Sequence, residues 1–439
     1  MKKKYRIILY TSIFLLCVVA SIILVVKKSN SVYEEESKPK VVKHKSMLSM
    51  NLEQTAGSGD YKTVTQSSWP TEGYKFNAEL SKCENGSTLS WDDTKKAVIM
   101  QGNVSDKCYV YFDIWIPSIA DYCTSGTDLA TCVKNFGDQG PSVSNIYIHN
   151  SSLTNGAGDN SYRYAGANPN NFVCFGSDAS PCPIDNLYRI IGVFGENYHG
   201  ANGKQLVKLI KYDYMTTDEL GTDGDYSQTY KEWGMDSTYK GTYGDGERIG
   251  VYYWNYKATG SATNTWSTSL LNKTNLNTNF INNIGTTWAN KIATVTWKVG
   301  GNTWANIGTK TSSVAYTNEI TNPVTTNTTD NATTYSAKIG LMYVSDYGFA
   351  ASPDAWTLTM SSYNNTTATN NNWMYMGLYE WTISRYAVTS YGAFVVSFDG
   401  LVGYNFVNLN YGVRASFSLE SSVSYVSGSG SMSDPIVIN

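Results

Sequence analysis

The sequence predicts an α+β protein whose largest folded part occupies the C-terminal half. Short apolar runs bounded by Gly, Asn and Asp recur along the chain and are typical of β-strands. One segment, 274–290, instead repeats apolar residues at i, i+4 and i+8, which is the spacing of an amphipathic helix. The 439 residues are enough for two or three domains with a sizeable core.

The composition narrows the class of protein. Charged residues make up 16% of the chain, compared with about 25% in ordinary soluble domains, and Tyr occurs 34 times. A surface solvated by hydroxyl and amide groups suits the exterior of a bacterial cell. The net charge is −3 and no basic patch or nucleic-acid motif is present, so we expect no nucleic-acid partner.

The N-terminus carries an uncharged, mostly apolar run over residues 7–26, preceded by four basic residues. About 20 such residues suffice to cross a bilayer as a helix. We therefore expect a cytoplasmic tip and single membrane anchor at 1–28, with the bulk of the chain outside the cell by the positive-inside rule. The alternative is a cleaved signal peptide, whose apolar region is usually shorter, about 7–15 residues.

Six of the seven Cys lie outside the apolar run and fall in sequence-local pairs, which predicts three disulfides in an oxidising compartment. Zinc is less favoured because neither CxxC-type spacing nor neighbouring His residues are present. Pairing by proximity is one of many possible connectivities, and it joins Cys83 to Cys108, Cys123 to Cys132, and Cys174 to Cys182.

The chain between the anchor and the C-terminal part changes in character several times. Residues 29–66 are charged and lack apolar periodicity, as in an extracellular stalk. Residues 67–117 alternate short strand-like runs with turn signals, which predicts a small disulfide-stapled β-module. Residues 118–160 are expected to form a linker.

A larger domain is expected over residues 161–439. Its apolar runs 187–194 and 206–212 flank a polar loop and predict a β-hairpin. A Thr- and Asn-rich stretch near 309–334 predicts an exposed low-complexity insertion.

The stretch 380–419 is the candidate binding region. Three strand-like runs, 381–384, 393–397 and 413–419, are expected to form a small sheet with Tyr-, Asn- and Ser-rich loops. Exposed Tyr and Trp flanked by Asn and Ser provide contact area at low entropic cost, as antibody binding loops do. The candidate ligand-binding residues are Trp381, Tyr386, Tyr391, Phe398, Tyr404, Asn405, Phe406, Asn408, Asn410 and Tyr411.

Catalytic and metal-binding motifs are absent from the sequence, so we expect no catalytic residue, metal or cofactor. The His residues at 44, 149 and 199 stand alone and are expected to be solvated. Asp223, Asp225 and Glu232 share a loop that departs from the calcium-loop pattern, so a solvated loop is expected there too. The sequence leaves open whether two carboxylates pair as in a glycosidase, because such a pair is brought together by the fold and not by spacing along the chain.

Several short segments follow one another in the second half of the chain: YRIIGVF, LVKLIKY, TWSTSLLNKTNLNTNFINNI, IGLMYVSDYG and NNW. After them come a Trp-x-x-Ser motif at 381–384 and a Gly-Val-Arg-x-x-Phe motif at 412–417. This order resembles surface proteins of Gram-positive bacteria in the formylglycine-generating-enzyme-like branch of the C-type-lectin fold, in which the last two motifs flank a variable loop. The resemblance covers about residues 162–439 and implies a C-type-lectin-like domain.

Departures from the family pattern weigh against its known activities. No Cys follows Cys182, so the redox-active pair of formylglycine-generating enzymes is missing. The His cluster of related iron oxygenases and the Glu-Pro-Asn or Gln-Pro-Asp motifs of calcium-dependent lectins are missing as well. Some proteins of this fold are diversified by retroelements in a C-terminal loop, and the residue mixture over 386–410 is compatible with that.

These observations favour a membrane-anchored extracellular protein that binds an unknown protein or glycan through its aromatic, Asn-rich C-terminal face. Two other classes stay open. One is a cell-wall enzyme acting on glycan or peptide, and the other is a structural subunit of a surface appendage. Arg414 is expected to make a structural ion pair or a carbonyl contact.

Overall fold

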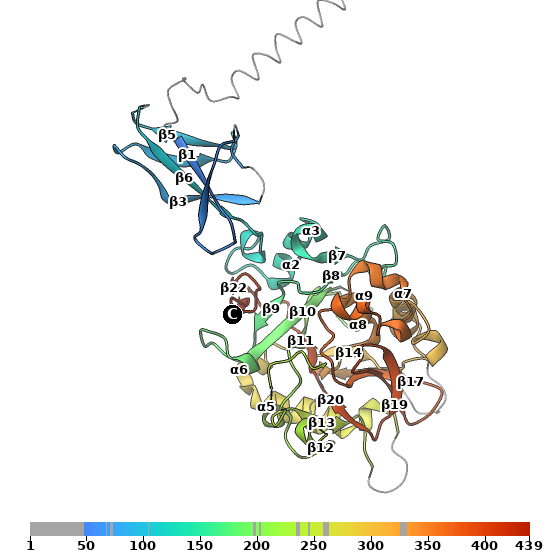
Figure 1. Cartoon of the computed structure of the whole chain (residues 1–439). Coiled ribbons are helices and arrows are strands. Elements are labelled where there is room, and N and C mark those ends of the chain that lie inside the picture. Colours follow the sequence, from blue (N-terminus) through green and yellow to red (C-terminus); the bar gives the residue numbers. More distant parts are fainter. Residues whose placement is uncertain are drawn as a thin grey trace, which may run out of the picture. The chain divides into compact units, whose positions relative to one another are not determined.

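A computed structural model describes residues 48–439 except 67, 71–72, 104, 196–198, 202, 234–237, 245, 258–262 and 325–331. The chain divides into two compact units, Met1–Ile116 and Pro117–Asn439 (Figure 1). The expected membrane anchor and the first part of the expected stalk lie outside the described residues. Over the described part of the chain, none of the helices is long and apolar enough to span a bilayer.

The first unit is built on a four-stranded sheet of order β2-β1-β6-β3, in which β1 and β6 run parallel. A separate hairpin, β4-β5, lies between β3 and β6 in the sequence. The small core of the unit contains Met50, Leu52, Val110 and Phe112. The strands are β1 (Leu48–Glu53), β2 (Tyr61–Val64), β3 (Tyr74–Cys83), β4 (Thr88–Asp92), β5 (Ala97–Gln101) and β6 (Cys108–Ile114).

The expected boundary between stalk and β-module at residue 66 is wrong, because β1 and β2 precede it and belong to the sheet. Met50 and Leu52 of β1 pair with Val110 and Phe112 of β6, and all four side chains are buried together. Only two apolar residues of β1 face the core, so the surrounding polar residues hid the strand in the sequence.

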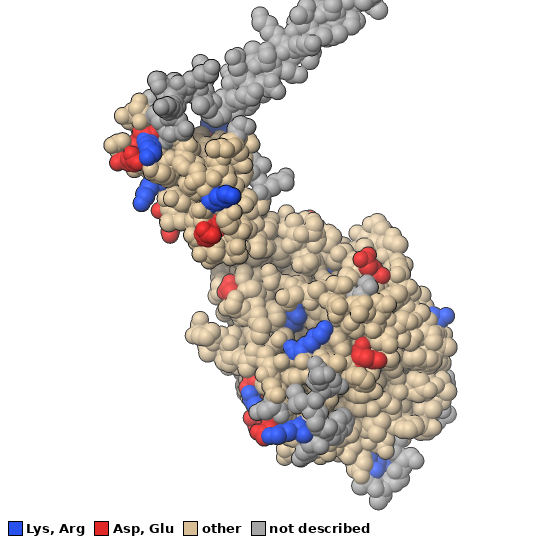
Figure 2. Space-filling model, viewed as in Figure 1, with Lys and Arg blue, Asp and Glu red and all other residues tan. Residues whose placement is uncertain are grey.

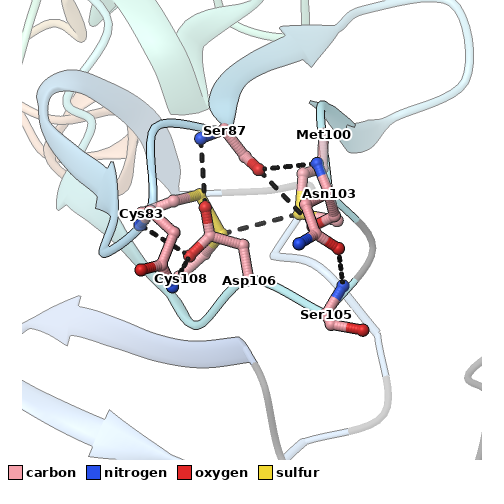
Figure 3. The surroundings of a disulfide bond; sticks show 8 residues. Cys83, Ser87, Met100, Asn103, Ser105, Asp106 and Cys108 are labelled. Atoms are coloured by element: carbon pink, nitrogen blue, oxygen red, sulfur yellow. Dashed lines mark hydrogen bonds between the residues drawn. A yellow bond between two sulfur atoms is a disulfide. The ribbon is translucent and has the colours of Figure 1, made fainter.

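The three expected disulfides are confirmed. Cys83 ends β3 and Cys108 begins β6, and the two are directly opposite in the antiparallel register. Beside this bond, the Asp106 carboxylate accepts a hydrogen bond from the backbone N–H of Ser87 at 3.0 Å (Figure 3). The disulfide and this carboxylate together close the end of a unit whose core is thin.

The second unit contains two larger sheets. The central sheet has seven strands, ordered β16-β21-β11-β10-β8-β7 with β9 pairing to β10. Its strands are β7 (Ile146–Ile148), β8 (Tyr162–Tyr164), β9 (Phe172–Cys174), β10 (Leu187–Phe194), β11 (Leu206–Lys211), β16 (Ile339–Gly340) and β21 (Ser416–Ser418). All residues of β10 and β11 are buried, and these two strands pair antiparallel, which confirms the expected hairpin.

The other large sheet has six strands in the order β12-β13-β20-β17-β18-β19. Its strands are β12 (Tyr226–Thr229), β13 (Gly250–Tyr253), β17 (Glu380–Tyr386), β18 (Gly392–Val396), β19 (Val402–Phe406) and β20 (Asn410–Gly412). Two-stranded pairs complete the unit: β14 (Val295–Lys298) with β15 (Thr334–Ala337), and β22 (Tyr425–Ser427) with β23 (Val437–Ile438).

Helices are short and lie between the strands. The segment 274–290 is helical as expected, divided into η6 (Leu271–Phe280), α5 (Ile281–Asn283) and α6 (Gly285–Ala289), with Phe280 and Trp288 buried. The remaining α-helices are α2 (Leu129–Gly137), α3 (Pro141–Ser144), α4 (Thr217–Leu220), α7 (Ser312–Tyr316), α8 (Val344–Ala350) and α9 (Thr366–Asn370). Single turns are η1 (Ile119–Asp121), η2 (Ile184–Asn186), η4 (Tyr230–Trp233), η5 (Trp266–Thr268), η7 (Trp304–Asn306), η8 (Thr317–Thr321), η9 (Pro353–Thr357) and η10 (Met360–Ser362).

Two expected loop regions belong to the core instead. The expected linker 118–160 carries α2, whose Leu129, Val133 and Phe136 are buried, and β7, which pairs with β8. The expected insertion 309–334 begins with α7 and η8, which bury Tyr316 and Ile320. Isolated apolar residues among Thr and Asn gave too weak a pattern to recognise α7 and η8.

The C-terminal stretch forms a different sheet from the one expected. β17 and β18 pair as expected, but β19 is an additional strand that completes the edge. The run 413–419 leaves this sheet, because Ser416–Ser418 pairs with β11 in the central sheet. The chain therefore crosses from one sheet to the other at Val413–Ala415.

Removing the disulfide of the first unit tests how far its thin core depends on it. Replacing Cys83 and Cys108 together by Ala is expected to lower the free energy of unfolding of this unit by about 2–4 kcal/mol, since the bond closes a long loop. Urea unfolding followed by tryptophan fluorescence measures the loss. The matched Cys123→Ala, Cys132→Ala variant should leave the transition of the first unit unchanged.

Candidate ligand-binding surface

Five aromatic side chains gather at the β18–β19 end of the six-stranded sheet, and we call this group the aromatic edge. Tyr386 stacks on Tyr404 with ring centroids 3.9 Å apart. Trp304 meets Tyr404 edge-on at 5.7 Å, and Tyr391 lies 5.4 Å from Phe406. Tyr404 and Phe406 are 43% and 55% exposed, so aromatic surface is open to solvent here.

The strand geometry explains why these rings meet. Tyr404 and Phe406 are two residues apart on β19, so both side chains point to the same face of the sheet. Gly392 of β18 lies between Tyr386 and Phe406 in the register. A Cβ at Gly392 would lie 2.9 Å from Cδ1 of Tyr386. The missing side chain therefore lets the Tyr386 ring lie across the sheet onto Tyr404.

A second aromatic group lies around β20. Tyr379 stacks on Tyr411 at 4.8 Å and lies 5.5 Å from Phe398. The side-chain amide of Asn405, which points away from the face of Tyr404, donates a hydrogen bond to the Tyr411 hydroxyl at 2.8 Å. This hydrogen bond ties the second group to β19.

The ten candidate residues divide by exposure. Tyr391, Phe398, Tyr404, Phe406 and Asn408 are exposed, and Asn405 and Asn410 are half-buried. Trp381, Tyr386 and Tyr411 are buried.

Trp381 is a correction to the expected binding set. Its indole N–H donates to the backbone carbonyl of Tyr252 at 2.8 Å and its ring is fully buried, so it packs within the sheet and is closed to solvent. Tyr386 and Tyr411 are buried and stack against Tyr404 and Tyr379, respectively, so they hold these two rings in position. Trp304 was missed because it lies far away in sequence.

A buried ion pair lies at the first residue of β17, Glu380. The Arg414 Nε donates to Glu380 Oε1 at 2.8 Å, and its Nη2 donates to the Met374 carbonyl at 2.7 Å. Both side chains are almost fully buried. The structural ion pair expected for Arg414 is thus present, together with a carbonyl contact. Burial raises the pKa of Glu380. Burial lowers the pKa of Arg414, but the Glu380 carboxylate raises it by more, so the pKa of Arg414 is raised overall.

A charged cluster lies inside the second unit. Lys208 Nζ lies 2.5 Å from Asp346 Oδ2, and Arg163 Nη2 lies 2.7 Å from Asp159 Oδ2. Arg163 Nη1 approaches Asp346 Oδ1 to 3.7 Å, which links the two pairs. The strand β11 is buried on both faces, yet it carries the two cations Lys208 and Lys211 among apolar residues, and these cations were the signal in the sequence.

Glu319 borders this cluster and connects it to the sheet of the aromatic edge. Its carboxylate accepts hydrogen bonds from the backbone N–H groups of Val344 and Ser345, both at 2.9 Å. The Ser384 hydroxyl of β17 also donates to it. Burial raises the pKa of Glu319 to about 7, against the opposing effect of these donors.

His149 and His199 are buried, contrary to the expectation that they are solvated. His149 Nδ1 accepts the backbone N–H of Ala157 at 3.0 Å. His199 Nε2 lies 3.6 Å from Asp159. Burial lowers the pKa of both imidazoles, so both rings are neutral near pH 7 and serve as packing residues.

The acidic loop is also more ordered than expected. Asp225 is buried and accepts the backbone N–H groups of Leu271 at 2.8 Å and Tyr256 at 3.0 Å. Asp223 accepts from the Asn279 side chain at 2.6 Å. Within the described part of the chain, no group of three or more His, Cys, Asp or Glu side chains is placed to hold a metal ion.

Comparisons with known proteins give no match: no family model, no curated protein and no solved structure is similar to this chain.

Arg414 offers a test of the buried ion pair. Arg414→Ala is expected to lower the free energy of unfolding of the second unit by about 3–5 kcal/mol, because Glu380 is left charged and unpaired. Arg414→Lys restores the charge but cannot reach both Glu380 and the Met374 carbonyl, so about 1–3 kcal/mol should still be lost. Denaturant unfolding measures both. Equal stability of the Lys variant and the parent would contradict the two-contact role.

Glu319 makes stability depend on pH. Its folded pKa of about 7 lies above its ordinary value of 4.5, so the folded state holds a proton that the unfolded state has released between these values. The free energy of unfolding should therefore fall as pH rises from about 4.5 to about 7. Denaturation midpoints measured across this range check the slope. In Glu319→Gln the slope should flatten, and an unchanged slope would assign it to other groups.

Proposed function

We propose that the protein binds an uncharged ligand, a glycan or a protein segment, outside the cell through the aromatic edge. The observation that carries this proposal is the exposure of Tyr391, Tyr404 and Phe406 side by side. The exposed Tyr404 ring is already held by stacking on the buried Tyr386. Contiguous exposed apolar surface is rare on soluble proteins and marks interaction sites. Rings held by stacking lose little entropy when a ligand covers them.

The scarcity of charged side chains near β19 supports an uncharged ligand. β19 and its flanking residues, Leu401 to Asn410, contain no ionisable group other than Tyr404. Most of the surface of the second unit that faces the viewer in Figure 2 is likewise free of Lys, Arg, Asp and Glu. Association here would depend on apolar contact and on hydrogen bonds from Tyr and Asn, with little sensitivity to salt.

The same proposal includes a C-type-lectin-like domain and a surface location. Two arrangements support the fold. The segments that carry the Trp-x-x-Ser and Gly-Val-Arg-x-x-Phe motifs lie next to each other, since Glu380 pairs with Gly412 and binds Arg414. The β18–β19 hairpin and every residue of the aromatic edge except Trp304 lie between those motifs in sequence. Three disulfides support an extracellular location, with the apolar N-terminal run as the membrane anchor.

The buried carboxylates favour binding over turnover. Asp213 accepts from Tyr239 and Thr242, and Asp225, Glu319, Asp346 and Glu380 are each held by internal donors or cations. A glycosidase would need two carboxylates facing the same cleft.

Truncating the exposed rings tests the site. The full chain is screened on glycan and peptide arrays, and the best-bound probe is then titrated. Tyr404→Ala and Phe406→Ala should each weaken binding by roughly tenfold or more, the usual effect of removing an aromatic hot spot. Tyr256→Ala is the matched control, because Tyr256 is 44% exposed and lies outside the aromatic edge.

Binding that all three variants leave unchanged would place the site elsewhere. Equal losses in Tyr256→Ala and Tyr404→Ala would indicate non-specific adhesion to aromatic surface.

A further inference from the structure

Lys208 and Asp346 face each other in a part of the second unit that excludes water. Their Nζ and Oδ2 atoms are 2.5 Å apart, and their side chains are 3% and 0% exposed. The Lys208 Nζ also lies 4.4 Å from the ring centroid of Tyr343 and 5.2 Å from that of Trp297. An amine and a carboxyl group are thus in contact, and the rings of Tyr343 and Trp297 pack around the amine.

The two oxygens of Asp346 are bonded unequally. Oδ2 accepts the backbone N–H of Tyr343 at 3.0 Å in addition to Lys208. Oδ1 is buried and has no hydrogen-bond partner, and its neighbour Arg163 Nη1 stays 3.7 Å away. One oxygen can therefore leave this carboxyl group while the other keeps the N–H of Tyr343 satisfied.

A second acid, Glu319, is bound to the segment that carries Asp346. Glu319 is bound to the N–H groups of Val344 and Ser345, the two residues directly before Asp346. Because burial raises its pKa to about 7, Glu319 exchanges a proton readily near neutral pH. The charge of Glu319 also acts on Lys208, whose pKa it raises.

We propose that Lys208 and Asp346 condense to an amide cross-link between β11 and the start of α8. One proton first passes from the Lys208 ammonium to the Asp346 carboxylate, which gives the neutral amine and the neutral acid. Nζ then attacks Cγ, and the C–N bond forms as one C–O bond breaks. The departing hydroxyl takes the second proton directly from Nζ and leaves as water. No oxidant, reductant or co-reactant is required.

The setting favours this reaction in two ways. Reacting groups held in contact behave as if highly concentrated, with effective molarities on the order of 10⁵–10⁸ M. Burial lowers the pKa of Lys208, which favours the neutral amine. Burial raises the pKa of Asp346, but Lys208 and the other neighbouring groups together lower it, so the ion pair is the resting form. The reaction is therefore slow, but it has to happen only once in the life of each molecule.

Lys211 provides an internal comparison on the same strand. Its Nζ lies 3.0 Å from Glu219 Oε1, but Glu219 is 16% exposed, and the Nζ also donates to the Asp185 carbonyl. Water reaches this carboxylate, so Lys211 and Glu219 should remain an ordinary ion pair.

Peptide mass spectrometry of the full chain decides the question. After reduction and trypsin digestion, the folded protein should yield a branched peptide that contains both Lys208 and Asp346 and is lighter than the sum of its parts by one water. Because trypsin does not cleave after a condensed lysine, the Lys208 part of this peptide should run to Lys211, and Glu219 should appear in an unlinked peptide that begins at Tyr212. In Lys208→Arg the positive charge remains but the guanidinium cannot condense, so the branched peptide should disappear.

Unlinked peptides of full mass for Lys208 and Asp346 in the matured wild-type protein would overturn the proposal. This result is decisive even if Lys208→Arg does not fold, because the wild-type digest alone answers it. The cross-link does not depend on ligand binding, so it can fail or succeed independently of the proposed function.

Discussion

The second unit is organised around the ion pair between Lys208 and Asp346. A buried charge is tolerated only when partners of opposite sign and hydrogen bonds surround it. Here Lys208 comes from the central sheet, Asp346 from the start of α8, and Arg163 from β8, so the need for compensation holds three separated segments in one arrangement. The rings of Tyr343 and Trp297 lie 4.4 Å and 5.2 Å from Lys208 Nζ and add cation–π contacts to this arrangement.

The same constraint extends to the surface. Glu319 binds the first residues of α8 and also Ser384 of β17, so the charged cluster and the six-stranded sheet are connected by one carboxylate. At the other end of β17, Glu380 and Arg414 fix the strand against β20. The β18–β19 hairpin extends from a strand that is held at both ends. A binding surface on such a support needs little reorganisation when a ligand arrives.

Sequence reasoning located the region of the candidate site but not its composition. The density of Tyr and Asn pointed to Tyr391, Tyr404 and Phe406, which the structure exposes. It also pointed to Trp381, which is buried, because a residue type alone does not reveal which face of a strand it occupies. Trp304 joins the site from about a hundred residues earlier in the chain, and no local pattern links it to Tyr404.

The sequence by itself determined the mixed α+β class, the β10–β11 hairpin, the helix over 274–290 and the three disulfides. These depend on local apolar periodicity and on the spacing of Cys, which neighbouring residues carry. Only the tertiary structure decided that β19 forms a sheet edge, that β21 leaves that sheet for the central one, and that Lys208 meets Asp346. Each depends on segments far apart in the chain, and burial and charge compensation act on the folded whole.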